Sequence, residues 1–321
     1  MNNTLQAECS ASKQKSAAST PLIFRIFAEF VASVFALFTV YMFSSVVTAM
    51  YGVNVLLIAA GTGLAYAAAI SISAKVSGGH VNPAVTIASM LTGRTSYISG
   101  ISYIVAQVIG AIVAAALTVF ILPQTKMIPA ETWFAPVVNG FESASISANQ
   151  LKSVNASFGV IAALIVEVIA VLIIVATAMT YTHEDGSAKC TYAAHMGIAY
   201  SVGTFITYQI TGAGLNPARS TGIAIFAQSK KLAVAPLSQL WVFWIAPIFA
   251  AALVGFVMLI SKLVNTPSVH EASNINNSNN ADDSSLNNSL QNDPALSTES
   301  KDKEDKEDED KEINPFYNED K

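Results

Sequence analysis

The tripeptide Asn-Pro-Ala occurs twice, as Asn82-Pro83-Ala84 and as Asn216-Pro217-Ala218, once in each half of the chain. Proline favours the first turn of a helix, where its missing N–H group costs nothing, and asparagine is a strong N-cap. Each tripeptide therefore predicts the start of a short helix with a polar amide donor at its tip. Both lie in apolar sequence too short to cross a membrane. Two such tips meeting inside a bilayer would form a polar spot in apolar surroundings.

A single acidic residue lies within the long apolar run that opens each half, Glu29 in the first and Glu167 in the second. Asn82 follows Glu29 by 53 residues, and Asn216 follows Glu167 by 49 residues. A carboxylate that faces lipid is costly, so each acid is expected to make contacts inside the protein. Two roles remain: accepting hydrogen bonds from the backbone of the loops that carry the tripeptides, which we favour, or relaying protons.

Six apolar runs are long enough to span a bilayer, which takes about 20 mainly apolar residues. They are residues 24–47, 55–74, 99–122, 158–181, 192–210 and 237–260. The shorter stretches 81–91 and 215–227 carry the tripeptides, so we expect re-entrant half-helices that line a cavity. The predicted fold is an all-α membrane protein with six transmembrane helices plus two re-entrant half-helices in an inverted repeat, with its functional site near the midplane.

The composition separates an apolar body from a charged tail. Hydrophobic residues make up 52% of the chain and charged residues 12%, against about 25% charged in a soluble protein. Residues 266–321 hold 15 acids and 5 lysines, so the net charge of −5 comes from the tail. We expect a cytoplasmic N-terminal segment without a cleavable signal peptide at 1–23 and a membrane domain at 24–262, with repeats at about 24–122 and 158–260. The tail at 266–321 is expected to be disordered, and Lys and Arg in the loops place both termini in the cytoplasm.

Residues 78–86, Gly-Gly-His-Val-Asn-Pro-Ala-Val-Thr, and 212–220, Gly-Ala-Gly-Leu-Asn-Pro-Ala-Arg-Ser, resemble the two signature loops of the aquaporins, the major intrinsic proteins. The resemblance covers about residues 24–262. It implies a passive water channel that excludes protons and ions, with no enzyme activity, no cofactor and no metal. It also implies a homotetramer in a plasma or vacuolar membrane, whose partners are lipid, water and small neutral solutes but no nucleic acid.

The resemblance gives Asn82 and Asn216 the task of donating side-chain N–H groups to water at the midplane, while the positive ends of both half-helices repel cations. It places an outer selectivity filter at Thr62, Thr204, Ala213 and Arg219. Water-specific members typically have Phe and His where this chain has the two threonines. A wider mouth would admit hydrogen peroxide, ammonia, urea or glycerol.

Other positions favour water. Ser220 follows Arg219 where glycerol facilitators resemble one another in having Asp, and Ala224 and Phe243-Trp244 match the water-type pattern. We therefore favour a water channel and keep two alternatives. One is a broader facilitator of small neutral solutes, and the other is a poorly conducting membrane scaffold or adhesion protein with the same fold.

Some loop residues suggest regulation or modification. His183 and His195 flank the loop 182–191, which gates the pore in some relatives, and histidine titrates in the physiological range. Asn155 begins an Asn-Ala-Ser glycosylation sequon on the predicted outer side. Cys9 and Cys190 are too few for a disulfide framework, and we expect two unpaired thiols.

Overall fold

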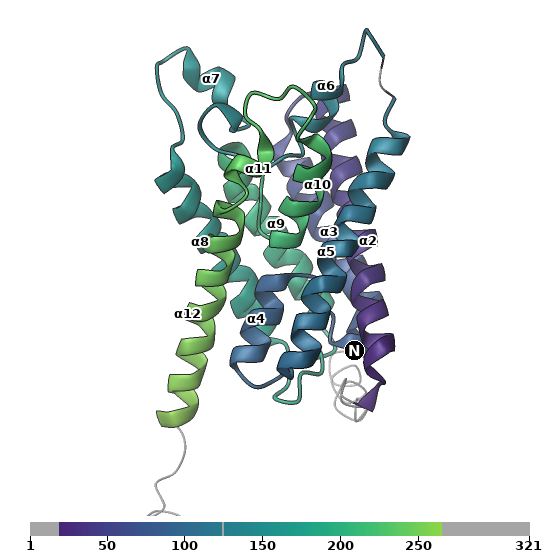
Figure 1. The fold of residues 1–321 in the computed structure, drawn as a ribbon. Coiled ribbons are helices and arrows are strands. Elements are labelled where there is room, and N and C mark those ends of the chain that lie inside the picture. Colours follow the sequence, from purple (N-terminus) through teal and green to yellow (C-terminus); the bar gives the residue numbers. More distant parts are fainter. Residues whose placement is uncertain (1–18, 124, 265–321) are drawn as a thin grey trace, which may run out of the picture. The chain divides into compact units, whose positions relative to one another are not determined.

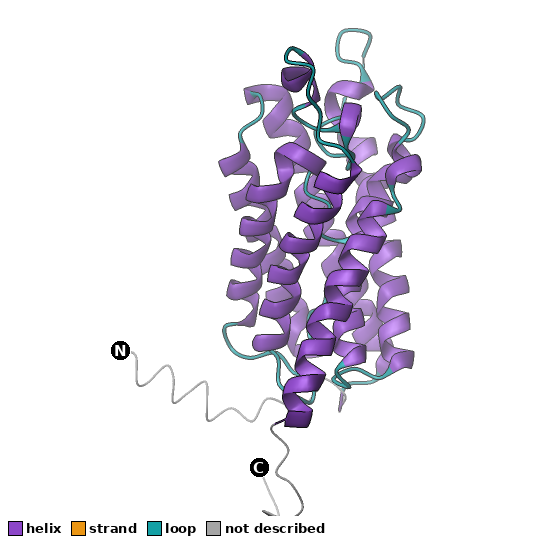
Figure 2. Cartoon of the chain, turned by 90° about the vertical axis from the view of Figure 1, so that its left-hand side faces the viewer, coloured by secondary structure: helices purple, strands orange, loops and turns teal. Residues whose placement is uncertain are grey.

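The structure, a computed structural model, describes residues 19–123 and 125–264. Over these ranges the regular secondary structure is helical (Figure 2). The exception is an isolated bridge between Thr182 and Ala188. The long helices are α2 (Leu22–Tyr51), α3 (Val55–Ser77), α5 (Tyr97–Ile121), α8 (Val160–Thr180), α9 (Tyr192–Thr211) and α12 (Val242–Val264). The short ones are α4 (Pro83–Leu91), α6 (Ala130–Phe134), η2 (Glu142–Ala144), α7 (Ala148–Lys152), α10 (Pro217–Ala227) and α11 (Pro236–Gln239).

Long apolar helices dominate this part of the chain. Five segments, ending with 236–264 around α12, are long and apolar enough to cross a membrane. The 20-residue α9 is not among them, because threonine, serine, glutamine and histidine interrupt its apolar residues. It nevertheless packs between α3 and α8, in the place of the fifth expected span. The predicted all-α fold class is confirmed.

The two half-helices enter the body from opposite ends. In Figure 1 α4 lies in the lower half and α10 in the upper half, while α2 begins and α12 ends at the bottom. Each half-helix starts at the proline of its tripeptide, as the sequence predicts. The second set of helices therefore repeats the first upside down.

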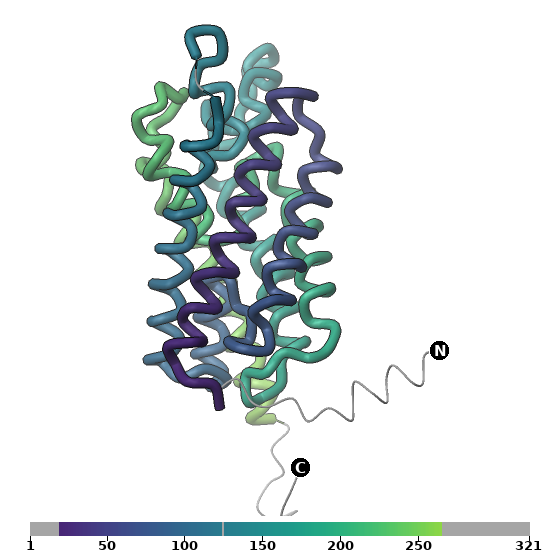
Figure 3. Tube along the Cα trace, turned by 90° about the vertical axis from the view of Figure 1, so that its right-hand side faces the viewer, coloured from purple at the N-terminus to yellow at the C-terminus, as the bar shows by residue number. Residues whose placement is uncertain are grey.

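Small residues allow the helices to approach closely. The helix α2 packs against α3 and α5, and α3 packs against α9, as the adjacent tubes of α2 and α3 in Figure 3 illustrate. At the crossing of α3 and α9, a Cβ added to Gly197 would lie 2.8 Å from the carbonyl oxygen of Gly63. Close contact between long helices in a membrane needs such small residues.

Some expectations fall differently or outside the described ranges. Cys190 is disulfide-bonded, so the expectation of an unpaired thiol is wrong there, and Cys9 lies outside the described residues. The predicted N-terminal segment is described only from residue 19, and the tail at 266–321 is not described.

Candidate functional site

The tips of α4 and α10 form the centre of the site. Asn82 caps α4 by accepting a hydrogen bond from the backbone N–H of Ala84 at 2.9 Å. Asn216 caps α10 by accepting one from Ala218 at the same distance. Both asparagines are fully buried, and each is followed by proline at the first helical position. The amide oxygens are therefore used inside the protein, and the amide N–H groups remain for other contacts.

Glu29 of α2 holds the first loop. Its two carboxyl oxygens accept hydrogen bonds from the backbone N–H groups of His80 at 2.9 Å and Val81 at 2.7 Å. The Ser77 hydroxyl and the Gln107 amide donate to the same carboxyl group. The acid is fully buried, so these donors replace the water that it would otherwise bind.

Glu167 of α8 does the same for the second loop. Its oxygens accept from the backbone N–H groups of Gly214 and Leu215, both at 2.8 Å, and from the Thr211 hydroxyl. The pattern of the first loop is repeated with different neighbours. Both acids thus make the backbone contacts that we favoured over proton relay.

The residue before each asparagine has a left-handed backbone, Val81 with φ 50° and Leu215 with φ 57°. Such a conformation is unusual for any residue with a side chain, and above all for a β-branched one. It comes with an exchange of hydrogen bonds between the loops. Asn216 Nδ2 donates to the carbonyl oxygen of Val81 at 2.8 Å, and Asn82 Nδ2 donates to that of Leu215 at 3.0 Å.

The second N–H group of each amide contacts a tyrosine instead of an open lumen. Asn82 Nδ2 lies 2.8 Å from the hydroxyl of Tyr200, and Asn216 Nδ2 lies 3.0 Å from the hydroxyl of Tyr66. We expected these amides to donate to water. In this conformation both N–H groups of each amide have protein acceptors.

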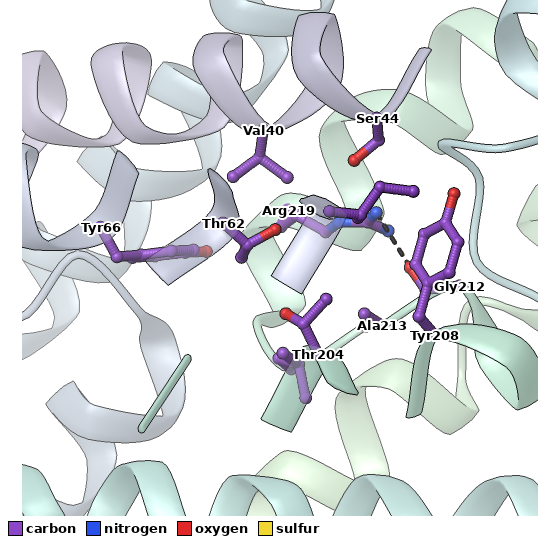
Figure 4. A pocket seen from close by; sticks show the side chains of 12 residues that line it. Val40, Ser44, Thr62, Tyr66, Thr204, Tyr208, Gly212, Ala213 and Arg219 are labelled. Atoms are coloured by element: carbon purple, nitrogen blue, oxygen red, sulfur yellow. Dashed lines mark hydrogen bonds between the residues drawn. The ribbon is translucent and has the colours of Figure 1, made fainter. Parts of the chain in front are cut away.

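The four expected filter residues line one pocket beside these loops. Thr62, Thr204, Ala213 and Arg219 all border it, and the figure shows the two threonines pointing toward the arginine, with Tyr66 at one side (Figure 4). The volume open to the centres of water molecules is about 10 Å³. That is roughly the space needed for a single water molecule. The buried Thr204 hydroxyl has no hydrogen-bond partner among the described residues, so it is left to bind an occupant.

Arg219 is fixed by a residue that the sequence did not single out. Its guanidinium donates to the carbonyl oxygen of Gly212 at 3.1 Å and to the side-chain oxygen of Asn139. The Asn139 amide in turn donates to the carbonyl oxygens of Thr211 and Gly212. A lone asparagine in a long loop gives no pattern that would have identified it.

The two tyrosines were also missed, although the sequence holds a signal for them. Tyr66 lies four residues after Thr62, and Tyr200 lies four residues before Thr204. Four residues is about one helical turn, so each tyrosine shares a helix face with a filter threonine. The opposite directions follow from the inverted repeat.

The loop residues lie away from this pocket. His183 is exposed, and His195 stacks on Tyr181 with ring centroids 3.7 Å apart. The Ser187 side chain and backbone N–H donate to Asp185 and hold its pKa below the ordinary value. Asn155 is exposed in the loop before α8.

The fold and the site together define a membrane protein of two inverted repeats whose half-helices meet at a polar centre beside a narrow, arginine-lined pocket. Residues 16–258 match the family model described as major intrinsic protein. The chain therefore belongs to the major intrinsic protein family, a family of membrane channels.

Several curated proteins are similar to the chain. Aquaporin TIP2-3 of Arabidopsis thaliana is 29% identical over 190 residues, which cover 59% of this chain and 64% of the relative. Aquaporin-4 of Bos taurus is 31% identical over 204 residues, which cover 63% of this chain and 55% of the relative. The lens fiber major intrinsic protein of Ovis aries is 31% identical over 229 residues, which cover 71% of this chain and 77% of the relative. The chain thus spans less than two thirds of the length of the first two relatives.

A solved structure supports the fold. The X-ray structure of the aquaglyceroporin from Plasmodium falciparum aligns with a TM-score of 0.55 and 20% identity, covering 72% of this chain and 94% of that one. At this level of identity the likeness shows the fold and does not indicate which solute passes.

Proposed function

We propose that the chain is a passive water channel that excludes protons and ions. The observation that carries the proposal is the outer pocket, which offers space for about one water molecule. It lies next to the fixed Arg219 and the Thr204 hydroxyl, which has no hydrogen-bond partner in the part of the chain that the structure describes. A water molecule there would find a donor and an acceptor in place of the bonds it loses on leaving bulk water. Permeation would be driven by the osmotic gradient alone.

Charge exclusion follows from the same geometry. Arg219 is a permanent cation at the pocket, so an approaching cation meets repulsion. Further in, α4 and α10 point their N-terminal ends at the centre, and these ends carry positive partial charge. A hydronium ion would have to pass both barriers, whereas a neutral molecule meets neither.

The test is stopped-flow light scattering on proteoliposomes, with water and glycerol permeability taken from one preparation. In an impermeant osmolyte, vesicles that contain the wild-type protein should shrink faster than protein-free vesicles. Glycerol entry should stay at the protein-free rate. If neither water flux nor glycerol flux exceeds that of protein-free vesicles, the proposed function is contradicted.

A second candidate is a broader facilitator of small neutral solutes. It is favoured by the two threonines, whose side chains are much smaller than the Phe and His of water-specific relatives. Fast glycerol entry in the same experiment would establish this candidate over the first. Replacing Thr62 by Phe should then slow glycerol more than water, because the larger ring fills the pocket.

We further propose the setting of this channel. The conducting domain is residues 24–262, with both termini in the cytoplasm, and four copies assemble as a homotetramer in a plasma or vacuolar membrane. The apolar helices support the membrane location, and the start of α2 and the end of α12 lie on the same side, which supports a shared side for the termini (Figure 1). The homotetramer is what the resemblance to the family implies. Mass photometry in nanodiscs and protease protection in sealed vesicles test the assembly and the orientation.

A further inference from the structure

Two aromatic rings lie face to face, and their hydroxyls contact the asparagines at the half-helix tips. Tyr66 comes from α3 and Tyr200 from α9, and their ring centroids are 3.4 Å apart with an interplanar angle of 4°. Only 2% of Tyr66 and none of Tyr200 is exposed. Carbon atoms in van der Waals contact lie about 3.5–4.0 Å apart, so no water passes between these rings.

The tyrosine hydroxyls occupy the donors that a permeating water would use. Asn82 donates to Tyr200 and Asn216 donates to Tyr66, so each half-helix tip is bonded to the ring from the opposite repeat. The remaining N–H group of each amide is bonded to a loop carbonyl oxygen. A water molecule at the centre therefore has no asparagine donor unless a tyrosine first moves away.

One ring of the pair borders the outer pocket. Tyr66 borders that pocket on the side away from Arg219, one helical turn beyond Thr62 (Figure 4). Because Tyr200 is stacked on Tyr66, a molecule that leaves the pocket past the threonines on this side would meet the pair next. Filter and rings would act in series.

We infer that Tyr66 and Tyr200 form an aromatic gate at the centre of the pore, and that separation of their rings limits permeation. This inference rests on the proposed channel function. Opening breaks the ring stack and moves two hydroxyls off their amides, and water must then take their place. The cost of such contacts makes the open state a minority of roughly 10% or less, so removing the rings should raise water permeability about tenfold.

The experiment compares unitary water permeability in proteoliposomes for the wild type, Tyr66→Val, Tyr200→Val and the double valine variant. Flux is normalised to the protein reconstituted. The double variant should conduct about tenfold faster than the wild type, with the single variants between them. The matched control is Tyr66→Phe with Tyr200→Phe, which keeps both rings and removes both hydroxyls. It should stay far below the valine variant, and a phenylalanine pair that is as fast would overturn the ring gate.

The failure of the gate and the failure of the channel give different results. If the wild type and the double valine variant have the same water permeability, and both exceed protein-free vesicles, the gate is overturned and the proposed channel function stands. If the water permeability of both proteins equals that of protein-free vesicles, the gate and the channel function are both overturned.

A cysteine variant gives an independent measurement if the valine variants reconstitute poorly. Tyr200→Cys should conduct faster than the wild type, lose that flux on addition of mercuric chloride, and regain it with a reductant. The treated wild type is the control for the native cysteines. A fast Tyr200→Cys channel that mercury leaves unchanged would show that this position is not on the path, which overturns the inference.

Discussion

Arg219 is a buried cation whose position depends on one loop residue, Asn139. Replacing Asn139 by Ala removes an acceptor from the guanidinium and two donors from the chain around Gly212. Hydrogen bonds to charged groups are worth about 1.5–3 kcal/mol, so the free energy of unfolding should fall by about that amount. The freed arginine should also select less strictly, which raises the ratio of glycerol to water permeability.

The two readouts are thermal unfolding in detergent and the stopped-flow permeability ratio. Asn149→Ala is the matched control, because Asn149 lies exposed in the same loop region. A variant at Asn139 that behaves like this control in both measurements would contradict the positioning role.

Asp185 bears on any pH response of the loop 182–191. The hydrogen bonds from Ser187 lower its pKa, so it remains ionised down to a pH below the ordinary range for aspartate. The stability that its ionised form gives the loop is present above the unfolded-state pKa and is lost as the pH falls through the lower folded pKa. Asp185→Asn should therefore leave the pH dependence of permeability between about pH 5 and 8 unchanged.

If water permeability does change with pH in that window, the residues to test are His183 and His195. If His183→Ala and His195→Ala both keep the wild-type pH profile, the gating hypothesis for these histidines is rejected. If Asp185→Asn abolishes the response, the expectation for the aspartate fails. Hydrogen exchange of the loop amides shows whether the loop itself loosens.

At the scale of the helices, the sequence predicted the half-helices most accurately, since proline and asparagine define a helix start through local chemistry alone. Both α4 and α10 begin at their prolines. The start of the last long helix was less accurate, because the apolar Leu240 and Trp241 lie between the short α11 and α12 and extend the apolar run beyond the helix start. The ring contact of Tyr66 with Tyr200 could not be read from periodicity, since it depends on how closely α3 and α9 pack.

The crossing of α3 and α9 is therefore the element contact to test. A Cβ at Gly63 would collide with the Ser201 hydroxyl and the Gly197 carbonyl oxygen. Overpacking of this kind costs about 1–3 kcal/mol, so Gly63→Ala should lower the unfolding midpoint measurably. Gly159→Ala is the control, because no atom lies within 4 Å of a Cβ added there. If Gly63→Ala lowers the unfolding midpoint no more than Gly159→Ala does, then α3 and α9 can move apart to fit the extra methyl group without loss of stability.

For the whole molecule, the inverted repeat makes the two halves equivalent in their polar contacts as well as in their helices. Each half supplies one glutamate to hold its own loop, one asparagine bonded to a carbonyl of the other loop, and one tyrosine bonded to the asparagine of the other half. The repeat and the glutamates could be predicted from spacing. The exchange between halves could not, because it joins residues more than 100 positions apart.

The exchange predicts that the two glutamates are energetically coupled. In Glu29→Gln or Glu167→Gln, the new amide group faces a backbone N–H group and leaves it without an acceptor, which costs about 1–3 kcal/mol. Because each loop also holds the asparagine of the other, a loop loosened in one half weakens the contacts that the second substitution would break. The double variant should therefore lose less stability than the two single losses added together, with a coupling of about 0.5–3 kcal/mol. Thermal unfolding of the four proteins in one detergent measures this cycle, and the exposed Glu131→Gln serves as the control. Strictly additive losses would mean that the two loops are held independently, in spite of the hydrogen bonds that cross between them.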